Sequence, residues 1–262
     1  MAIPPETGFL AASALFDCDI RTAAGLHRLV TTFPPEAPAW QDFGLDAAEF
    51  HDELQRLEPF DTGDGFRTFY RLYARKQNKP RYGDKTPAYC EHVALIESIL
   101  PEAHFIHIIR DGRDASLSLR RTWFAPGQDI PTLALYWRNM VCKARDAGKR
   151  SQAYLELSYE KLVRNPRPLL ETVCRFLGME FDAAMLRYWE RTPERLTEHR
   201  TRRRVDGTVL VTHEQRLLQQ RLTMEPPAPE RLSRWKSEMT VEEQSEFRRY
   251  AGDTLDELGY EV

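Results

Sequence analysis

The residue types that could bind an anion lie in one short segment, residues 104–119, which reads HFIHIIRDGRDASLSL. An apolar run ends at Arg110, a turn through Asp111 and Gly112 follows, and Ser118 comes eight residues after the arginine. A guanidinium can form two parallel hydrogen bonds to a phosphate or sulfate group, and the start of a helix offers free N–H groups to an anion. The segment therefore predicts an anion site; the plainer alternative is a strand, a turn and a cluster of solvated charges.

The elements around this segment alternate between strands and helices. Residues 104–109, a short apolar run rich in isoleucine, are predicted to form a buried parallel strand, and residues 153–157 a second strand. Helices are predicted over residues 90–100, 111–121, 131–147 and 166–177, and over residues 45–57, 66–76 and 241–258 elsewhere in the chain. This alternation indicates an α/β fold with a parallel sheet, in which ligands bind at the carboxyl ends of the strands.

Composition excludes several classes of protein. The chain has 262 residues, of which 37 are basic and 40 acidic, and a net charge of −3 argues against a general nucleic-acid binder. The four cysteines form no CxxC motif and the histidines show no metal-ligand spacing, so no metal is predicted. Neither a signal peptide nor a run of about 18 apolar residues is visible. We therefore expect a cytoplasmic protein without a membrane partner.

Several segments resemble one known family. Residues 108–118 resemble the 3′-phosphate-binding segment of the sulfotransferases that use 3′-phosphoadenosine 5′-phosphosulfate (PAPS). Other segments resemble the bacterial and protein-tyrosine branch of this family, in the same order along the chain: IPPETGFL at 3–10, YGDKTP at 82–87, SYEKLVRNP at 158–166 with Phe-Leu-Gly at 176–178, RLSRWK at 231–236 and LDELGYE at 255–261. The resemblance spans nearly the whole chain.

The resemblance implies a reaction and its catalytic residues. PAPS would donate a sulfuryl group to a hydroxyl or amine of a small-molecule or peptide acceptor. Glu6 would be the general base and Lys85 the cation at the leaving oxygen, with Asp84 as a weaker candidate for orienting the lysine. The alternatives are a capping or surface glutamate at position 6 and a solvated loop lysine at position 85.

The resemblance also implies contacts to the nucleotide. Arg110 and Ser118 would bind the 3′-phosphate. Tyr159 would contact the nucleotide at the end of the second strand, unless it is a packed core tyrosine. A loop near the C-terminus would close over the nucleotide, unless it forms only a basic cluster at the start of a helix; its candidate residues are Ser233, Arg234 and Lys236.

Three neighbours of these candidates are expected to have structural roles. Arg113 and Asp114 are expected to face each other and the solvent. Trp235 is expected to anchor the last helix in preference to stacking on adenine.

The resemblance finally implies a three-layer parallel sheet of the P-loop NTPase-like sulfotransferase type, in a single domain over residues 1–262. Residues 20–75 would form a helical lid on the acceptor side, and residues 223–262 a C-terminal loop and helix. The family begins with a strand and a Gly-x-x-Arg-Ser-Gly-Thr-Thr loop, which this sequence lacks, so we expect the first strand to be missing. The alternative function is a truncated, inactive nucleotide-binding or interaction protein, and an open sheet edge would favour a homo-oligomer.

Overall fold

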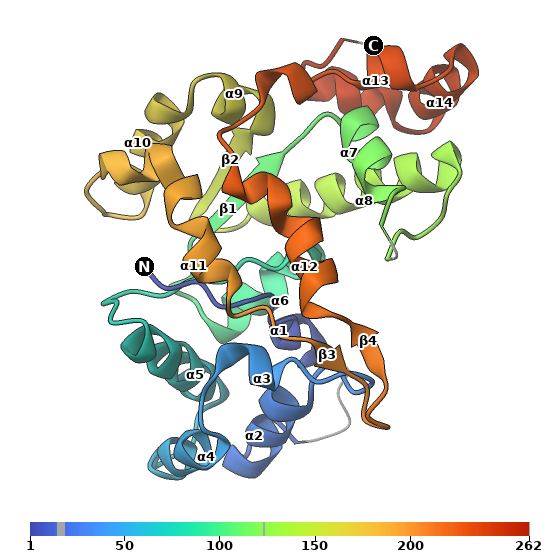
Figure 1. Ribbon diagram of the computed structural model, residues 1–262. Coiled ribbons are helices and arrows are strands. Elements are labelled where there is room, and N and C mark those ends of the chain that lie inside the picture. Colours follow the sequence, from blue (N-terminus) through green and yellow to red (C-terminus); the bar gives the residue numbers. More distant parts are fainter. Residues whose placement is uncertain (15–18, 123, 262) are drawn as a thin grey trace. The chain divides into compact units, whose positions relative to one another are not determined.

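The computed structural model describes residues 1–14, 19–122 and 124–261, and it divides into two compact units. Unit 1 comprises Met1–Glu102 and Tyr188–Glu225, and unit 2 comprises Ala103–Arg187 and Pro226–Val262. The chain passes from unit 2 back to unit 1 within η2 (Ala183–Glu190), a course that can be followed by colour in Figure 1. The single domain over residues 1–262 stays a prediction.

Unit 1 is mainly helical, and its helices begin where the sequence supplies capping side chains. Asp46 and Asp61 each accept hydrogen bonds from backbone N–H groups in the first turn of the helix that follows. These helices confirm the predictions over residues 45–57 and 66–76. The elements of this unit are α1 (Phe9–Ala12), α2 (Ala23–Thr32), α3 (Trp40–Phe43), α4 (Ala47–Gln55), α5 (Thr62–Lys76), η1 (Pro87–Glu91), α6 (Val93–Ile99), α11 (Thr192–Leu196), β3 (Arg202–Arg203), β4 (Val209–Val211), α12 (His213–Gln220) and η3 (Arg221–Met224).

An aromatic core holds the helices of unit 1 together. Phe9, Phe43 and Phe69 are fully buried, and the ring of Phe69 meets the other two edge to face at centroid distances of 5.0 Å. Such pairs contribute about 0.5–1.5 kcal/mol beyond the area they bury. Residues 20–75 include α2 to α4 and all of α5 except its last residue, Lys76. Their role as an acceptor lid stays a prediction.

Unit 2 contains a parallel pair of strands. β1 (Phe105–Ile109) pairs with β2 (Tyr154–Ser158), and the register joins Phe105 to Tyr154 and Ile109 to Ser158. The carboxyl ends of the two strands therefore lie side by side, and both predicted strands are present (Figure 1). The expectation that the first strand is buried is wrong for Ile106 and Ile108, which are 36% and 49% exposed, because alternate side chains point to opposite faces and one face of β1 is exposed. The remaining elements of this unit are α7 (Gly112–Leu119), α8 (Ile130–Gly148), α9 (Tyr159–Arg164), α10 (Pro166–Phe176), η4 (Pro229–Arg231), α13 (Trp235–Glu238) and α14 (Val241–Glu257).

The predicted fold class is confirmed at a coarse level. The described residues form the two-stranded parallel sheet β1–β2 and, in unit 1, the antiparallel pair β3–β4. The α/β class and the parallel pairing are thus correct, while the three-layer sheet and the missing first strand stay predictions. The last helix, α14, ends as expected, because Gly259 follows it with a φ of 75° that favours glycine.

The start of α7 packs very closely against the core of unit 2. A Cβ atom added at Gly112 would lie 2.4 Å from Trp137 Cδ2 and 2.7 Å from Phe247 Cζ. Both rings belong to the buried core that α8 and α14 form with α7. A residue without a side chain is therefore required here, and Gly112 sets how closely the turn after β1 approaches this core.

We expect Gly112→Ala to lower the free energy of unfolding by about 1–3 kcal/mol, because the added methyl group must displace two buried rings. Gly252→Ala in α14 is the matched control. Within 4 Å, its Cβ would meet only Arg248 Cγ, at 3.3 Å, and alanine favours a helix over glycine by about 1 kcal/mol. Urea denaturation measures both changes, and unaltered stability in Gly112→Ala would contradict the close packing.

Candidate functional site

Three of the predicted nucleotide residues come together at the carboxyl ends of β1 and β2. Arg110 Nη1 donates to Ser118 Oγ at 3.2 Å, and the Arg110 guanidinium carbon lies 4.9 Å from the centre of the Tyr159 ring. The register places Ile109 opposite Ser158, so the residues that follow the two strands become neighbours. Arg110, Ser118 and Tyr159 form what we call the Arg110 cluster.

The guanidinium of Arg110 is only partly satisfied. Its Nη2 lies 3.6 Å from Asp114 Oδ2, while its Nε is buried and has no hydrogen-bond partner among the described residues. A buried donor without a partner costs about 1–3 kcal/mol, which an oxyanion bound to this guanidinium would offset. A guanidinium, a hydroxyl and an aromatic ring together fit a nucleotide phosphate and its attached nucleoside.

Two N–H groups at the start of α7 are already bonded within the protein. Asp111 caps the helix by accepting a hydrogen bond from Arg113 N at 2.9 Å, and Glu160 Oε1 accepts one from Asp111 N at 2.9 Å. The expectation that this helix start offers free N–H groups to an anion is therefore wrong for these two groups. The charge available to an anion at this turn is the side chain of Arg110.

Arg113 and Asp114 are buried and have partners other than each other, which corrects the prediction that they face solvent. Arg113 donates from Nε and Nη2 to Asp111 at 3.0 and 2.8 Å, and its guanidinium lies 3.5 Å from the centre of the Trp235 ring. Asp114 accepts from the backbone N–H groups of Ser233 and Trp235 at 2.8 and 2.9 Å. Trp235 is buried, as predicted for an anchor. These charges hold the C-terminal loop against α7.

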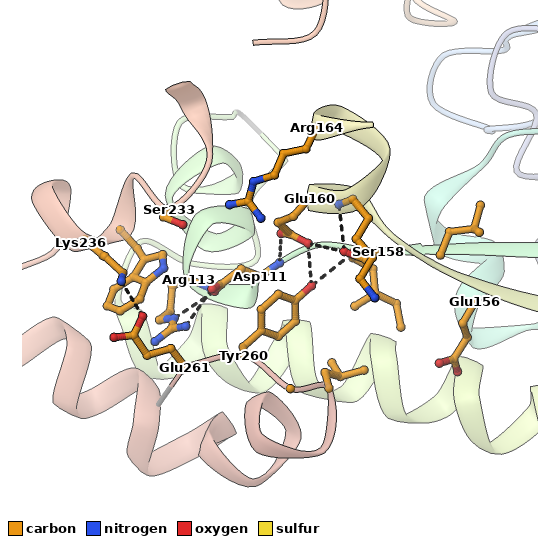
Figure 2. A pocket seen from close by; sticks show the side chains of 16 residues that line it. Asp111, Arg113, Glu156, Ser158, Glu160, Arg164, Ser233, Lys236, Tyr260 and Glu261 are labelled. Atoms are coloured by element: carbon orange, nitrogen blue, oxygen red, sulfur yellow. Dashed lines mark hydrogen bonds and ion pairs between the residues drawn. The ribbon is translucent and has the colours of Figure 1, made fainter. Parts of the chain in front are cut away.

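The C-terminal loop borders an open cavity of about 600 Å³ within unit 2. Ser233 and Lys236 line it, and Figure 2 shows Lys236 directed toward Glu261, which accepts its hydrogen bond at 2.5 Å. Arg110 and Tyr159 are not among the lining residues, although the residues on either side of each of them are. The cavity is therefore lined by the residues immediately before and after Arg110 and Tyr159, whose own side chains form the Arg110 cluster.

The basic side chains of the loop already have acidic partners. Arg234 donates to both oxygens of Glu238 at 2.6 and 2.7 Å, and Lys236 pairs with Glu261. Ser233 has a φ of 60°, which is uncommon for a residue with a side chain. The structure thus places Ser233, Arg234 and Lys236 in one loop, but neither cation is part of the Arg110 cluster.

The two predicted catalytic residues meet in unit 1, although 79 residues separate Glu6 from Lys85. The segments that carry them run in parallel: Ala2 N donates to Arg81 O at 2.7 Å, and Gly83 N donates to Ala2 O at 2.9 Å. Lys85 Nζ donates to Glu6 Oε1, and both side chains remain more than half exposed. A carboxylate and an ammonium group therefore share one accessible site.

Asp84 joins the same two segments from the buried side. Its Oδ2 accepts hydrogen bonds from Thr7 Oγ1 and Tyr70 OH, both at 2.6 Å, and its Oδ1 accepts one from Thr86 Oγ1 at 2.9 Å. Burial raises the pKa of Asp84, the three hydroxyl groups oppose this rise, and the nearby charge of Glu6 adds to it. Burial and the charge of Asp84 also raise the pKa of Tyr70 well above its usual value, so the Tyr70 hydroxyl stays a donor.

The sheet and its edge define an α/β protein with a candidate phosphate site where the strands end. A family model described as "Sulfotransferase family" matches residues 17–183, which is more than half of the chain. The chain belongs to the sulfotransferase family.

Two solved structures share this fold. A sulfotransferase domain from the curacin biosynthetic pathway is 16% identical with a TM-score of 0.55, and the match covers 99% of this chain and 88% of that one. A sulfotransferase domain from the Synechococcus PCC 7002 olefin synthase is 20% identical with a TM-score of 0.56, covering 99% of this chain and 85% of that one. At these identities the likeness concerns the fold alone. A search of curated proteins found no match.

The described residues show neither a candidate metal site nor a candidate membrane span. They include no group of three or more His, Cys, Asp or Glu side chains placed to hold a metal ion. None of their helices combines the length and apolar character that a membrane span requires.

Sequence analysis missed the anchoring roles of Asp114 and Glu160. Glu160 lies in the Tyr-Glu motif quoted above, yet no role was assigned to it. It accepts hydrogen bonds from Asp111 N, Ser158 Oγ and Tyr260 OH. The available signal for Glu160 was its position beside Tyr159, and for Asp114 its position in the turn and helix that follow Arg110. That signal could not identify the partners, because they come from distant segments.

We expect Asp84 to make the folded state less stable as the pH rises above about 3.9, the ordinary pKa of an aspartate. Because burial raises the pKa of Asp84, the folded state binds the proton more tightly than the unfolded state does. The stabilisation is therefore complete at low pH and is lost as the pH rises through the raised pKa. Each tenfold difference in proton affinity between the folded and unfolded states corresponds to about 1.4 kcal/mol.

Urea denaturation of the wild type and of Asp84→Asn, from about pH 4 to about pH 8, isolates this contribution. The stability of the wild type relative to the variant should fall across this range. A relative stability that rises or stays constant would contradict the effect of burial on Asp84.

Proposed function

We propose that this protein transfers a sulfuryl group from PAPS to a hydroxyl or amine of a small-molecule or peptide acceptor, and releases adenosine 3′,5′-bisphosphate. Membership of the sulfotransferase family supports the reaction class. The observation that carries the choice of donor is the Arg110 cluster, in which a guanidinium with a buried Nε, unpartnered among the described residues, lies beside a hydroxyl and an aromatic ring.

In this proposal the Arg110 cluster holds the nucleotide. Arg110 and Ser118 bind the 3′-phosphate, exchanging their mutual hydrogen bond for bonds to its oxygens, and Tyr159 contacts the nucleoside. Charge-assisted hydrogen bonds of this kind contribute about 1.5–3 kcal/mol each. Ser233 adds a hydroxyl from the C-terminal loop. Arg234 and Lys236 reach the nucleotide by exchanging their carboxylate partners for phosphate oxygens.

The proposed chemistry uses the ion pair of unit 1. The acceptor oxygen or nitrogen attacks the sulfur atom, and the bond between sulfur and the bridging oxygen of PAPS breaks. Glu6 takes the proton that the acceptor loses. Lys85 stabilises the negative charge that develops on the leaving oxygen. Both roles use the charged forms in which the two side chains pair.

We expect Arg110→Ala to weaken the binding of adenosine 3′,5′-bisphosphate roughly tenfold or more, since the loss of a charge-assisted pair costs about 1.5–3 kcal/mol. Arg150→Ala, which removes an exposed arginine of the same unit, is the control and should leave the affinity unchanged. Isothermal titration calorimetry measures the dissociation constants. Equal affinities for Arg110→Ala and wild type would refute the placement of the 3′-phosphate.

We expect Glu6→Gln to lower kcat by roughly 10²–10⁴ where chemistry limits the rate, because the amide keeps the shape but cannot accept the proton. The affinity for adenosine 3′,5′-bisphosphate should stay unchanged. Formation of this product from PAPS, followed over a panel of phenols, alcohols, amines and tyrosine peptides, provides the rate. Glu214→Gln, which alters an exposed glutamate of α12 in the same unit, is the control. A near-normal kcat for Glu6→Gln would exclude Glu6 as the base.

A further inference from the structure

The residues around Glu6 and Lys85 alternate between solvent and the interior. Thr7 is buried at 2% exposure, while Glu6 before it is exposed. Lys85 is exposed, while Asp84 and Thr86 on either side of it are less so. This is the pattern of extended chain, in which successive side chains point to opposite sides. Each catalytic candidate is therefore attached to neighbours whose side chains point inward.

These inward side chains form a directed chain of hydrogen bonds. Tyr89 OH accepts from Leu10 N at 3.3 Å, so its own proton is free to be donated to Thr7 Oγ1, 2.7 Å away. Thr7 in turn donates to Asp84 Oδ2. Burial raises the pKa of Tyr89, and the charge of Asp84 adds to this, so the phenol stays protonated and able to donate. The chain of donors ends on the carboxylate.

A second branch arrives at the same carboxylate. Thr86 Oγ1 accepts from Thr7 N at 3.2 Å and donates to Asp84 Oδ1 at 2.9 Å. Tyr70 OH, from α5, donates to Asp84 Oδ2. A carboxylate accepts on both oxygens and has no proton to offer. The Asp84 carboxylate can therefore accept hydrogen bonds from three hydroxyl groups at once, which an amide or a hydroxyl group at this position could not do.

We propose that Asp84 is a positioning residue that holds the segment carrying Glu6 against the segment carrying Lys85, so that the two charged groups face each other. It acts through Thr7 and Thr86, the residues that follow Glu6 and Lys85. The donors that reach Asp84 in these two branches are hydroxyl groups. The cation Lys85 pairs instead with Glu6. The consequence for catalysis rests on the proposed function, whereas the consequence for the ion pair does not.

Two variants of Asp84 test this role with the full chain. Asp84→Ala removes all three acceptor contacts, and Asp84→Asn keeps the shape with one acceptor oxygen. Thr212→Ala is the control for lost stability in the same unit, because Thr212 caps α12 through Gln215 N and lies outside both the predicted acceptor lid and the segments of the pair. Loss of such a cap costs about 1 kcal/mol and should leave both measurements below unchanged in the folded protein.

The first measurement does not depend on activity. The rate at which acetic anhydride acetylates Lys85 is measured by mass spectrometry and divided by the rate at Lys79. This ratio reports whether the ion pair between Lys85 and Glu6 is kept. The ratio should rise at least threefold in Asp84→Ala and less in Asp84→Asn. Lys79 is an exposed lysine of the same unit and serves as the internal reference.

The second measurement is the split between kcat and KM. A displacement of about 1 Å can lower a rate about 10²-fold, so kcat should fall about 10- to 100-fold in Asp84→Ala, with KM for PAPS changed less than about twofold. If Asp84→Asn folds and keeps both the wild-type acetylation ratio and the wild-type kcat, the proposal is wrong. If the wild type transfers no sulfuryl group, the proposed function fails, and the acetylation ratio alone decides whether Asp84 positions the pair.

Discussion

The arrangement of unit 2 depends on one buried carboxylate, Glu160, which joins three separate stretches of chain. Its Oε1 accepts from Asp111 N at 2.9 Å, and its Oε2 accepts from Ser158 Oγ and Tyr260 OH, each at 3.0 Å. The end of β1, the end of β2 and the C-terminal residues are thereby fixed to one another. Burial and the charge of Glu160 raise the pKa of Tyr260, which keeps its hydroxyl a donor. Glu160 is not part of the Arg110 cluster, but it fixes the chain segments that carry the residues of the cluster.

In unit 1, too, a carboxylate joins segments that are far apart in the sequence. Long-range contacts between irregular segments need a group that can accept several hydrogen bonds at once, since backbone pairing there is limited to a short bridge. Asp84 provides this group, and the three hydroxyl donors around it offset part of the desolvation of its charge. A carboxylate on the interior side of each candidate site therefore organises it, Glu160 being buried and Asp84 half-buried. The side chains proposed to touch ligands are their exposed or half-buried neighbours.

Arg110 and Arg113 of unit 2 have different roles, which their positions in the sequence do not distinguish. Arg113 is buried, paired with Asp111 and stacked on Trp235, so it is part of the scaffold. Arg110, three residues earlier, retains a buried donor without a partner among the described residues. Both have the same formal charge and both follow the same strand. Their difference arises because Asp111 accepts two hydrogen bonds from the guanidinium of Arg113. The acid nearest Arg110, Asp114, lies 3.6 Å from its Nη2 and accepts its hydrogen bonds from the backbone of the C-terminal loop.

The sequence by itself determined several elements of this protein and its family. Periodicity predicted β1, β2, α4, α5 and α14, because the spacing of apolar residues and the capping residues act within a few positions of one another. The spacing of Arg110 and Ser118 placed both on the turn and helix after β1, where they meet. Short-range regularities of this kind are recorded directly in the order of residues.

The tertiary structure decided which charges face each other. Asp114 binds the N–H groups of Ser233 and Trp235, which lie 119 and 121 residues away, and does not pair with Arg113. The meeting of Glu6 with Lys85 and the gathering of three hydroxyls around Asp84 also join segments far apart in sequence. The sequence could not specify these partners, because a buried polar group takes whichever donors the packed chain brings within about 3 Å, and that choice depends on the whole fold.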